Sequence, residues 1–394
     1  MQYDRRAVAV IAATTMAVAT FSQTIFGVLA ADLIAVFDTQ RWQIGILVTA
    51  TGMTGALLSP AVGRLTDSLG STRSVLIVLG AGMGGMVMIA TAPRYWLLVA
   101  GALAGGIAQG WANPATNALV VDHVAAGARG IITGVKQSGV QMGAFLGGLL
   151  LPSLAVIIGW RGGVAVFLVF PVLATLFLWR LPNQARPADA GDANRRPLPP
   201  QVKWLALYGA LAGLGISATN TFLPLFAEEG QGWTTVQGGM LIAAVGLVGV
   251  VARIGWGNWA ERLTYAPVLR YLAIQSAAST LLLVAAALEM IPGWVLIPAA
   301  VLFGSGALAW TAVGMLAVME FSPPGLVGRG TGLINLGFLS GISLGAPLIG
   351  LSVDRLGVYA PGWLGVAVLF GAGAVLAGRI GSAGRTAGRA GSEA

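Results

Sequence analysis

The sequence predicts an all-α membrane protein with twelve transmembrane helices in two pseudo-symmetric six-helix bundles. Three observations support this fold class. Hydrophobic residues make up 56% of the 394 residues and charged residues only 9%, whereas a soluble domain carries about 25% charged residues. Apolar runs long enough to cross a bilayer recur along the chain. The two halves of the chain also repeat one another in motif order.

The spans can be placed from the apolar runs, because crossing the hydrocarbon core takes about 20 apolar residues in helical conformation. The run after Arg5 and Arg6 is too long for the apolar region of a signal peptide, and similar runs follow it. The predicted spans are 7–31, 43–62, 75–93, 95–120, 130–152, 157–179, 204–226, 236–257, 268–288, 293–318, 330–351 and 361–378.

The 22 Lys and Arg residues are unevenly divided between the two sides of these spans. If the N-terminus is cytoplasmic, only Arg41, Arg94, Arg161 and Arg355 lie in outer loops. Because cytoplasmic loops are enriched in Lys and Arg, both termini are predicted to be cytoplasmic. The net charge of +8 then reflects topology and attraction to membrane lipid rather than nucleic-acid binding. The Ala-, Gly- and Arg-rich composition favours a bacterial inner (plasma) membrane, and a monomer is expected.

A polar segment separates the two halves. Residues 182–202 are rich in Pro, Asn, Asp and Arg, which is typical of a linker. We therefore expect an N-terminal bundle at 1–181, a cytoplasmic linker at 182–202 and a C-terminal bundle at 203–380. The segment 381–394 contains mainly Gly, Ser, Ala and Arg and is predicted to be a disordered cytoplasmic tail.

The residue types needed for most catalytic and metal sites are scarce. The chain has no Cys and a single His, His123, so thiolate chemistry and imidazole clusters are excluded. No metal, cofactor or enzymatic activity is expected. A lipid transferase or a membrane sensor would need clustered catalytic groups or a sizeable soluble domain, and the sequence contains neither.

Corresponding spans of the two halves carry matching motifs, as expected for a chain that arose by duplication. The matching pairs are Gln23-Thr24 with Asn220-Thr221, Trp111 with Trp310, Arg129-Gly130 with Arg329-Gly330, and Gly139-x-x-x-Gly143-Ala144 with Gly341-x-x-x-Gly345-Ala346. Because the pairs occur in the same order along both halves, chance agreement in Gly- and Ala-rich helices is a poor explanation for them.

The segment after the second span reads Gly63-Arg-Leu-Thr-Asp67-Ser-Leu-Gly70-Ser-Thr-Arg73, and Glu261-Arg262 recurs after the eighth. It resembles the signature loop of the major facilitator superfamily, although Ser68 stands where that family usually has Arg. The resemblance covers essentially the whole chain and implies a transporter whose halves are gated by charges at the cytoplasmic ends of the spans. The gating candidates are Gly63, Asp67, Gly70, Arg73, Asp122, Arg129, Glu261 and Arg262. An ordinary solvated charge is the alternative for Asp67.

Two cations, Lys136 and Arg253, are the only Lys, Arg, Asp or Glu residues expected in the cores of the spans, away from their ends. Such groups are costly in a membrane unless paired or hydrated, which makes them functional-site candidates. In the superfamily fold their helices face each other across a cavity, so an anion between them would relieve repulsion. The stretch Arg253-Ile-Gly-Trp-Gly257 also resembles the helix 8 pattern of monocarboxylate and oxalate-type carriers, in which that Arg binds the carboxylate. The alternative is that both side chains snorkel to lipid phosphates.

The predicted function is secondary active transport of a small organic anion, a mono- or dicarboxylate, by rocker-switch alternating access. Proton symport and anion exchange are both open. The predicted substrate-binding residues are Arg253, Lys136, Gln23, Thr24, Asn113, Asn117, Gln137, Asn220, Thr221, Trp111 and Trp310. For the polar members interhelical hydrogen bonding is the alternative role, and for the two Trp residues it is packing.

A proton-coupled drug or metabolite efflux antiporter is the alternative function. Gly139, Gly143 and Gly147 are among the glycines that reproduce the spacing of the antiporter motif, with Ala144 at its Pro position. However, Gly106 stands where the antiporter motif of the fourth span has Arg. Cationic drugs and proton antiport usually require a membrane carboxylate, and its absence from the predicted spans favours the anion carrier.

Overall fold

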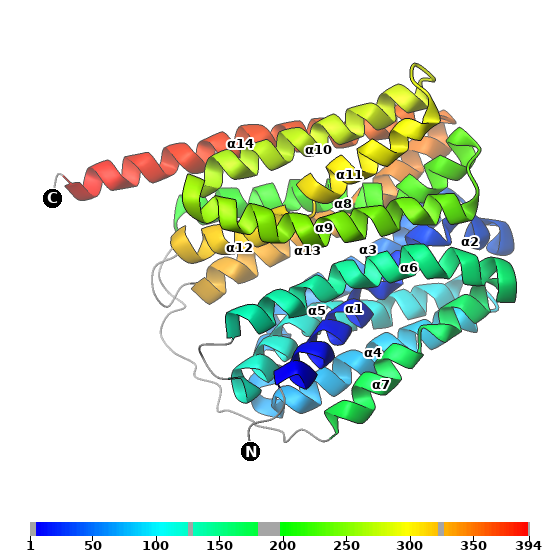
Figure 1. Cartoon of the computed structure of the whole chain (residues 1–394), viewed down its shortest axis with the longest axis horizontal. Coiled ribbons are helices and arrows are strands. Elements are labelled where there is room, and N and C mark those ends of the chain that lie inside the picture. The colour runs from blue at the N-terminus through cyan, green and yellow to red at the C-terminus, as the bar shows by residue number, and fades with distance from the viewer. Residues whose placement is uncertain (1–4, 125–128, 180–197, 322–326, 393–394) are drawn as a thin grey trace. The chain divides into compact units, whose positions relative to one another are not determined.

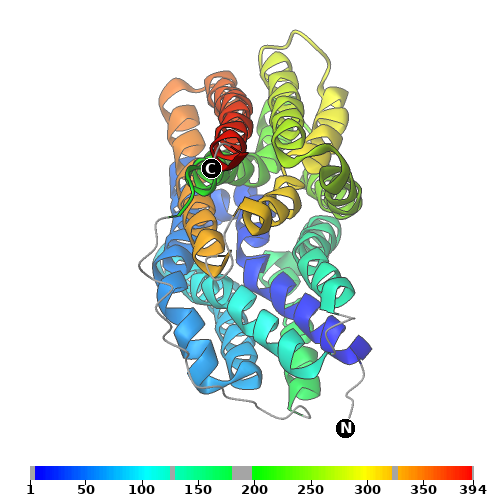
Figure 2. The same cartoon turned by 90° about the vertical axis from the view of Figure 1, so that its left-hand side faces the viewer.

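The computed structural model describes residues 5–124, 129–179, 198–321 and 327–392, and all regular elements in these ranges are helical. Figures 1 and 2 show the course of these helices. Contacts divide the chain into two compact units: residues 1–190 with 221–246, and residues 191–220 with 247–394. The helices that lie wholly in the first unit are α1 (Arg5–Val28), α2 (Ala30–Phe37), α3 (Arg41–Leu69), α4 (Ser71–Ala90), α5 (Tyr95–His123), α6 (Arg129–Val166) and α7 (Val169–Leu178).

Two helices contain residues of both units: α8 (Pro200–Gln231) and α9 (Thr235–Leu263). The remaining elements belong to the second unit. They are α10 (Tyr265–Ala287), η3 (Gly293–Val295), α11 (Leu296–Gly306), α12 (Trp310–Phe321), α13 (Val327–Leu356) and α14 (Ala360–Ser392). The division expected from the sequence, 1–181 against 203–380, stays a prediction.

Ten segments of the described chain are long and apolar enough to cross a membrane. One of them, Gly134–Leu178, covers most of two predicted spans, and the backbone is non-helical at Gly159 (φ 77°), near the start of the second. The predicted span 95–120 forms α5 but is not among the ten, because Gln109, Asn113 and Asn117 lower its mean hydropathy. These helices confirm the all-α membrane fold.

Close helix packing in both units depends on the paired glycines. In the first unit, α1 lies beside α6, and a methyl group added to Gly139 would collide with the backbone carbonyl of Ala13. In the second unit, a methyl group on Gly341 of α13 would collide with the carbonyl of Ala210 in α8. Small residues allow helix backbones to approach each other this closely, so the repeated motif is a repeated helix contact.

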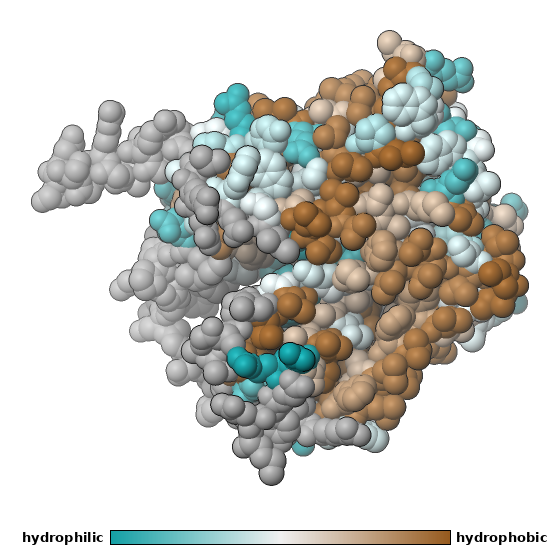
Figure 3. Space-filling view, in the orientation of Figure 1, coloured by the Kyte–Doolittle hydropathy of each residue, from teal (hydrophilic) through white to brown (hydrophobic). Residues whose placement is uncertain are grey.

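Apolar side chains face outward where a membrane protein contacts lipid. Val156 and Ile157 of α6 are 73% and 75% exposed, and Phe177 of α7 is 54% exposed. Hydrophobic residues gather over this region in Figure 3. Exposing such an apolar surface is unfavourable in water and favourable in the hydrocarbon core of a bilayer.

Three predicted loops or tails are helical instead. The signature segment was expected to be a loop from Gly63, but α3 continues to Leu69, and only Gly70 (φ 87°) breaks the helix before α4. Likewise α9 continues to Leu263 and ends at Thr264 (φ 90°). The tail from 381, predicted to be disordered, belongs to α14 as far as Ser392. Polar residues at the end of a span do not stop a helix unless a turn residue follows, and Ala and Arg favour helix.

Candidate functional site

Lys136 lies in the interior of the first unit and has no exposed surface. Its Nζ donates hydrogen bonds to Asn113 Oδ1, at 3.3 Å, and to Asn117 Oδ1. Gln137 Nε2 donates to the same Asn113 oxygen at 3.1 Å. The structure therefore brings together four residues that the sequence proposed separately, two from α5 and two from α6.

The Lys136 cluster, defined as Lys136, Asn113, Asn117 and Gln137, has donor capacity to spare. An ammonium group has three N–H donors, and only two acceptors for it lie in the described part of the chain. No carboxylate among the described residues forms an ion pair with Lys136. Asn117 is exposed, so the cluster reaches the surface of its unit. This arrangement suits an additional acceptor, such as an anionic oxygen.

The predicted residues on α1 lie beside helices of the same unit. Gln23 Nε2 donates to Gln109 Oε1 of α5 at 3.3 Å. Thr24 is half-buried, and its methyl group would lie 2.6 Å from a Cβ added to Gly147 of α6. Interhelical hydrogen bonding, the alternative role for Gln23, is therefore present.

Arg253 of α9 belongs to the second unit and is half-buried. Its Nε donates to the carbonyl oxygen of Leu308 at 3.1 Å. Leu308 lies between α11 and α12, where the tenth predicted span is interrupted. The amide of Ala312 bonds to Ala309 rather than to Leu308, so the Leu308 carbonyl is left to accept from side chains. The predicted pairing of Lys136 with Arg253 joins residues of separate units and stays a prediction.

The two repeated Trp residues are both buried but differ in their polar contacts. Trp111 Nε1 donates to Thr66 Oγ1 of α3 at 2.9 Å. Trp310 is 2% exposed and lies against the rings of Tyr208 and Phe338, with centroids 5.7 and 5.2 Å away. Its Nε1 has no hydrogen-bond partner among the described residues. The indole donor of Trp111 is thus used within the first unit, whereas that of Trp310 has no acceptor among the described residues. A role of either Trp in substrate binding stays a prediction.

In α8 the predicted residues have additional polar neighbours in sequence. Asn220 is half-buried and Thr221 is 2% exposed. Ser217 and Thr219 are also buried, and in the described structure their hydroxyls lack hydrogen-bond partners. These two are not among the predicted binding residues, although the run Ser217-Ala-Thr219-Asn220-Thr221 inside an apolar span was a visible signal.

Most of the predicted gating side chains lie outside the described residues: Gly63, Asp67, Arg129, Glu261 and Arg262. Gly70 terminates α3 and accepts hydrogen bonds from Ser74 at its carbonyl. Arg73 is exposed, and Asp122 is half-buried near the end of α5. Their gating role stays a prediction.

An ion pair that the sequence did not predict lies at the start of α3 and the end of α8. Arg41 Nε and Nη2 donate to the two carboxylate oxygens of Glu229, at 2.9 and 3.0 Å. The neighbouring Glu228 accepts from Thr235 Oγ1 at 3.0 Å and interacts electrostatically with Asp32 of α2. Burial raises the pKa of the Asp32 carboxyl. An Arg after the first span and an acid pair after the seventh were the available signal.

Comparison with known proteins identifies the family. The family model described as Major Facilitator Superfamily matches residues 12–346. The chain belongs to the major facilitator superfamily. An uncharacterised MFS-type transporter of Mycobacterium tuberculosis is 26% identical over 317 residues, covering 77% of this chain and 69% of the relative. A class D tetracycline resistance protein of Salmonella ordonez is 23% identical over 311 residues, covering 76% and 74%.

Solved structures of superfamily transporters share the fold. A bacterial homologue of the human lysosomal transporter Spinster, in an inward-facing and occupied conformation, matches with a TM-score of 0.78 at 16% identity, covering 97% of this chain and 98% of the other. A D-xylose-proton symporter matches with a TM-score of 0.79 at 14% identity, covering 94% and 96%. The chain is therefore a multi-pass membrane transporter, while its substrate is a separate question.

Proposed function

We propose that this member of the major facilitator superfamily is a secondary active carrier of a small organic anion, a mono- or dicarboxylate. The Lys136 cluster carries the proposal. A buried ammonium whose donors exceed its acceptors, with no acidic partner among the described residues, forms an anion site in which amide groups can orient a carboxylate.

Arg253 supplies the second cation of the proposed site. Its Nε donates to the Leu308 carbonyl, and this hydrogen bond fixes the position of the guanidinium group. A planar guanidinium matches the two oxygens of a carboxylate. In the proposed rocker-switch cycle, the bound anion relieves repulsion between Lys136 and Arg253 and so permits the halves to close around it. Proton symport and anion exchange both accommodate this cycle.

A ligand-stabilisation experiment tests the proposal. Purified protein is heated in detergent with lactate, pyruvate, oxalate, succinate or tetracycline, and the unfolding midpoint is recorded. A ligand at 100 times its Kd stabilises the folded state by about 2.7 kcal/mol. We expect one carboxylate to raise the midpoint of the wild type and of Lys203→Gln, an exposed Lys on α8. The same carboxylate should have no effect on Lys136→Gln or Arg253→Gln.

The alternative function is drug efflux by proton antiport, and two observations favour it. A tetracycline resistance protein is among the relatives, and the glycine spacing of α6 resembles the antiporter motif. Stabilisation by tetracycline that survives in both Lys136→Gln and Arg253→Gln would establish this alternative and reject the anion carrier.

A further inference from the structure

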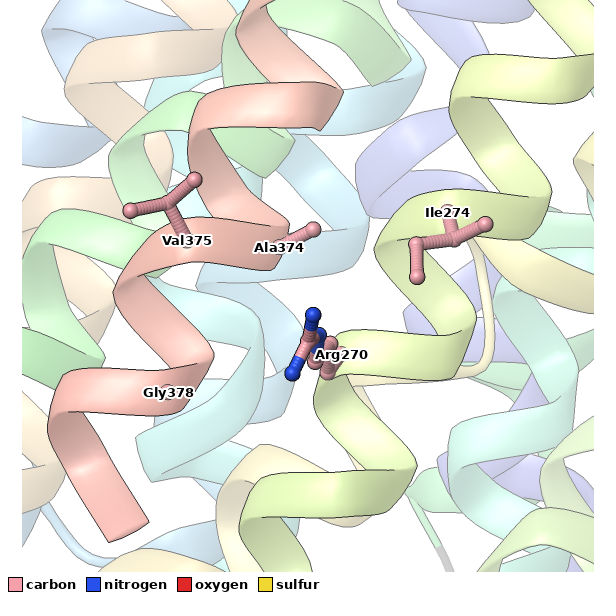
Figure 4. Close-up of a pocket in the computed structure, with 5 residues that line it drawn as sticks. All are labelled: Arg270, Ile274, Ala374, Val375 and Gly378. Carbon is pink, nitrogen blue, oxygen red and sulfur yellow. The ribbon is translucent and has the colours of Figure 1, made fainter. Parts of the chain in front are cut away.

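The second unit contains a groove between α10 and α14 that plays no part in the proposed transport site. It has a volume of about 400 Å³ and is lined by Arg270, Ile274, Ala374, Val375 and Gly378. Figure 4 shows Arg270 and Ile274 on one helix and the other three on the facing helix. A Cβ added to Gly378 would meet nothing within 4 Å, so small side chains create the space.

Two aliphatic side chains that line this groove face outward. Ile274 is 50% exposed and Val375 is 67% exposed. Both belong to segments long and apolar enough to span a membrane, Tyr265–Ala287 and Ala360–Ile380. An exposed aliphatic side chain on a spanning helix contacts lipid chains. An acyl chain can therefore lie against these two side chains.

Arg270 places a positive charge at one end of the groove. It is exposed, and in the part of the chain that is described no hydrogen bond or ion pair involves it. It lies five residues into α10, about 8 Å along the axis at 1.5 Å per residue. Its guanidinium is directed toward α14 in Figure 4. The donors are thus available to an anionic group from outside the protein.

Nearby aromatic residues indicate that Arg270 lies at the depth of the lipid head groups. Trp256 packs against Trp259 and Tyr271, with centroids 5.4 and 5.2 Å away. Arg379, which follows Gly378, lies over the ring of Trp204 at 5.4 Å. Trp and Tyr concentrate at the membrane–water interface. The positive-inside distribution assigns this end to the cytoplasmic leaflet, which is rich in anionic lipid.

We propose that this groove is a binding site for one anionic phospholipid. Its phosphate accepts hydrogen bonds from Arg270, and one acyl chain lies over Ala374 and Gly378 between Ile274 and Val375. The site does not depend on which substrate the protein transports, so it stands or fails separately from the proposed function.

Native mass spectrometry of the full-length protein tests the proposal. The protein is mixed with equal amounts of phosphatidylglycerol and phosphatidylcholine that have the same acyl chains. We expect wild type to retain one phosphatidylglycerol in preference, and Arg270→Gln to lose roughly tenfold in affinity for it, as expected for one charge-assisted contact. Gly378→Leu, which fills the groove without changing charge, should lose a similar factor.

Two matched controls should retain the lipid. Lys203→Gln removes another exposed base of the same unit, and Gly371→Leu adds the same side chain to α14 at another position with nothing within 4 Å of a Cβ. If Gly378→Leu does not fold, Ala374→Leu replaces it. Equal retention of the two lipids, or unchanged retention in Arg270→Gln, would mean non-specific lipid and overturn the proposal. Displacement of the lipid by millimolar inorganic phosphate would overturn it in favour of a free-anion site.

Discussion

At equivalent positions of the repeat, the first unit carries Lys136 where the second carries Phe338, each three residues before the first glycine of its motif. Two residues after the paired Trp, Asn113 corresponds to Ala312. Six residues after it, Asn117 corresponds to Leu316. Equivalent pairs of helices therefore support different contacts. In the first unit, α5 and α6 hold a hydrogen-bonded cation. In the second unit, α12 and α13 form an aromatic contact between Trp310 and Phe338.

The backbone packing beneath these side chains is shared. Gly139 and Gly143 lie against Ala13 and Ala17 of α1, and Gly341 and Gly345 lie against Ala210 and Leu214 of α8. The two units thus keep the helix contacts and differ in the chemistry that those helices present. Duplication preserves what close packing requires, while side chains that do not enter the contact are free to diverge.

The largest effect should come from removing the acceptors of Lys136. Asn113→Leu with Asn117→Leu leaves the buried ammonium without either hydrogen bond, and each such bond to a charged group contributes about 1.5–3 kcal/mol. We expect the free energy of unfolding in mixed micelles to fall by about 3 kcal/mol or more. Adding Lys136→Met should recover most of the loss, because it removes the unpaired charge. A triple variant as unstable as the double one would show that the Asn residues act through packing alone.

The shared helix contact gives the second prediction. Gly139→Ala and Gly341→Ala each place a methyl group against a backbone carbonyl. We expect similar losses in both units, about 1–3 kcal/mol each, since a backbone cannot yield as a side chain can. Gly134→Ala and Gly332→Ala are matched controls, because nothing lies within 4 Å of their Cβ positions. The measurement is the thermal midpoint of all four variants. A clearly different loss for Gly139→Ala and Gly341→Ala would refute a shared helix contact.

Substitutions at the two turns that follow the signature segments should change the stability of the protein in opposite directions. Gly70 and Thr264 have nearly the same conformation, φ 87° and ψ 163° against φ 90° and ψ 150°. Only Gly adopts this region without strain, which costs other residues about 1–3 kcal/mol. Thr264→Gly should therefore raise stability by about 1 kcal/mol, and Gly70→Ala should lower it by at least as much. A Thr264→Gly variant with a lower thermal midpoint would argue against strain at this turn.

The smallest expected effect distinguishes the two Trp residues. Trp111→Phe removes the hydrogen bond to Thr66 and should cost about 1 kcal/mol beyond the loss of ring area. Trp310→Phe removes a donor with no partner in the described structure, so only the loss of ring area is expected. Comparing the two free energies of unfolding isolates the polar contribution. Equal losses would mean that the Thr66 contact contributes nothing.

Composition and hydropathy were enough to determine that the chain is an all-α membrane protein, because a bilayer admits only helices and closed barrels, and only a spanning helix leaves a run of about 20 apolar residues. The glycine motifs likewise predicted close helix contacts, and the signature segment indicated the superfamily. The helical continuation to Leu69 was not predictable from residue types, since polar residues at a membrane border suit a helix or a loop equally well. A single turn residue, Gly70, decided it.

The candidate site divides in the same way. The sequence by itself identified Lys136, Asn113, Asn117 and Gln137, because polar groups inside apolar runs are conspicuous. Only the tertiary structure showed that Asn113 and Asn117 bind Lys136 while Trp111 bonds to Thr66. Likewise, Arg41 pairs with Glu229 across 188 positions of sequence. Hydropathy is a property of each segment and can be read locally, whereas a hydrogen bond between helices depends on their rotation and register, which the packing of the whole unit determines.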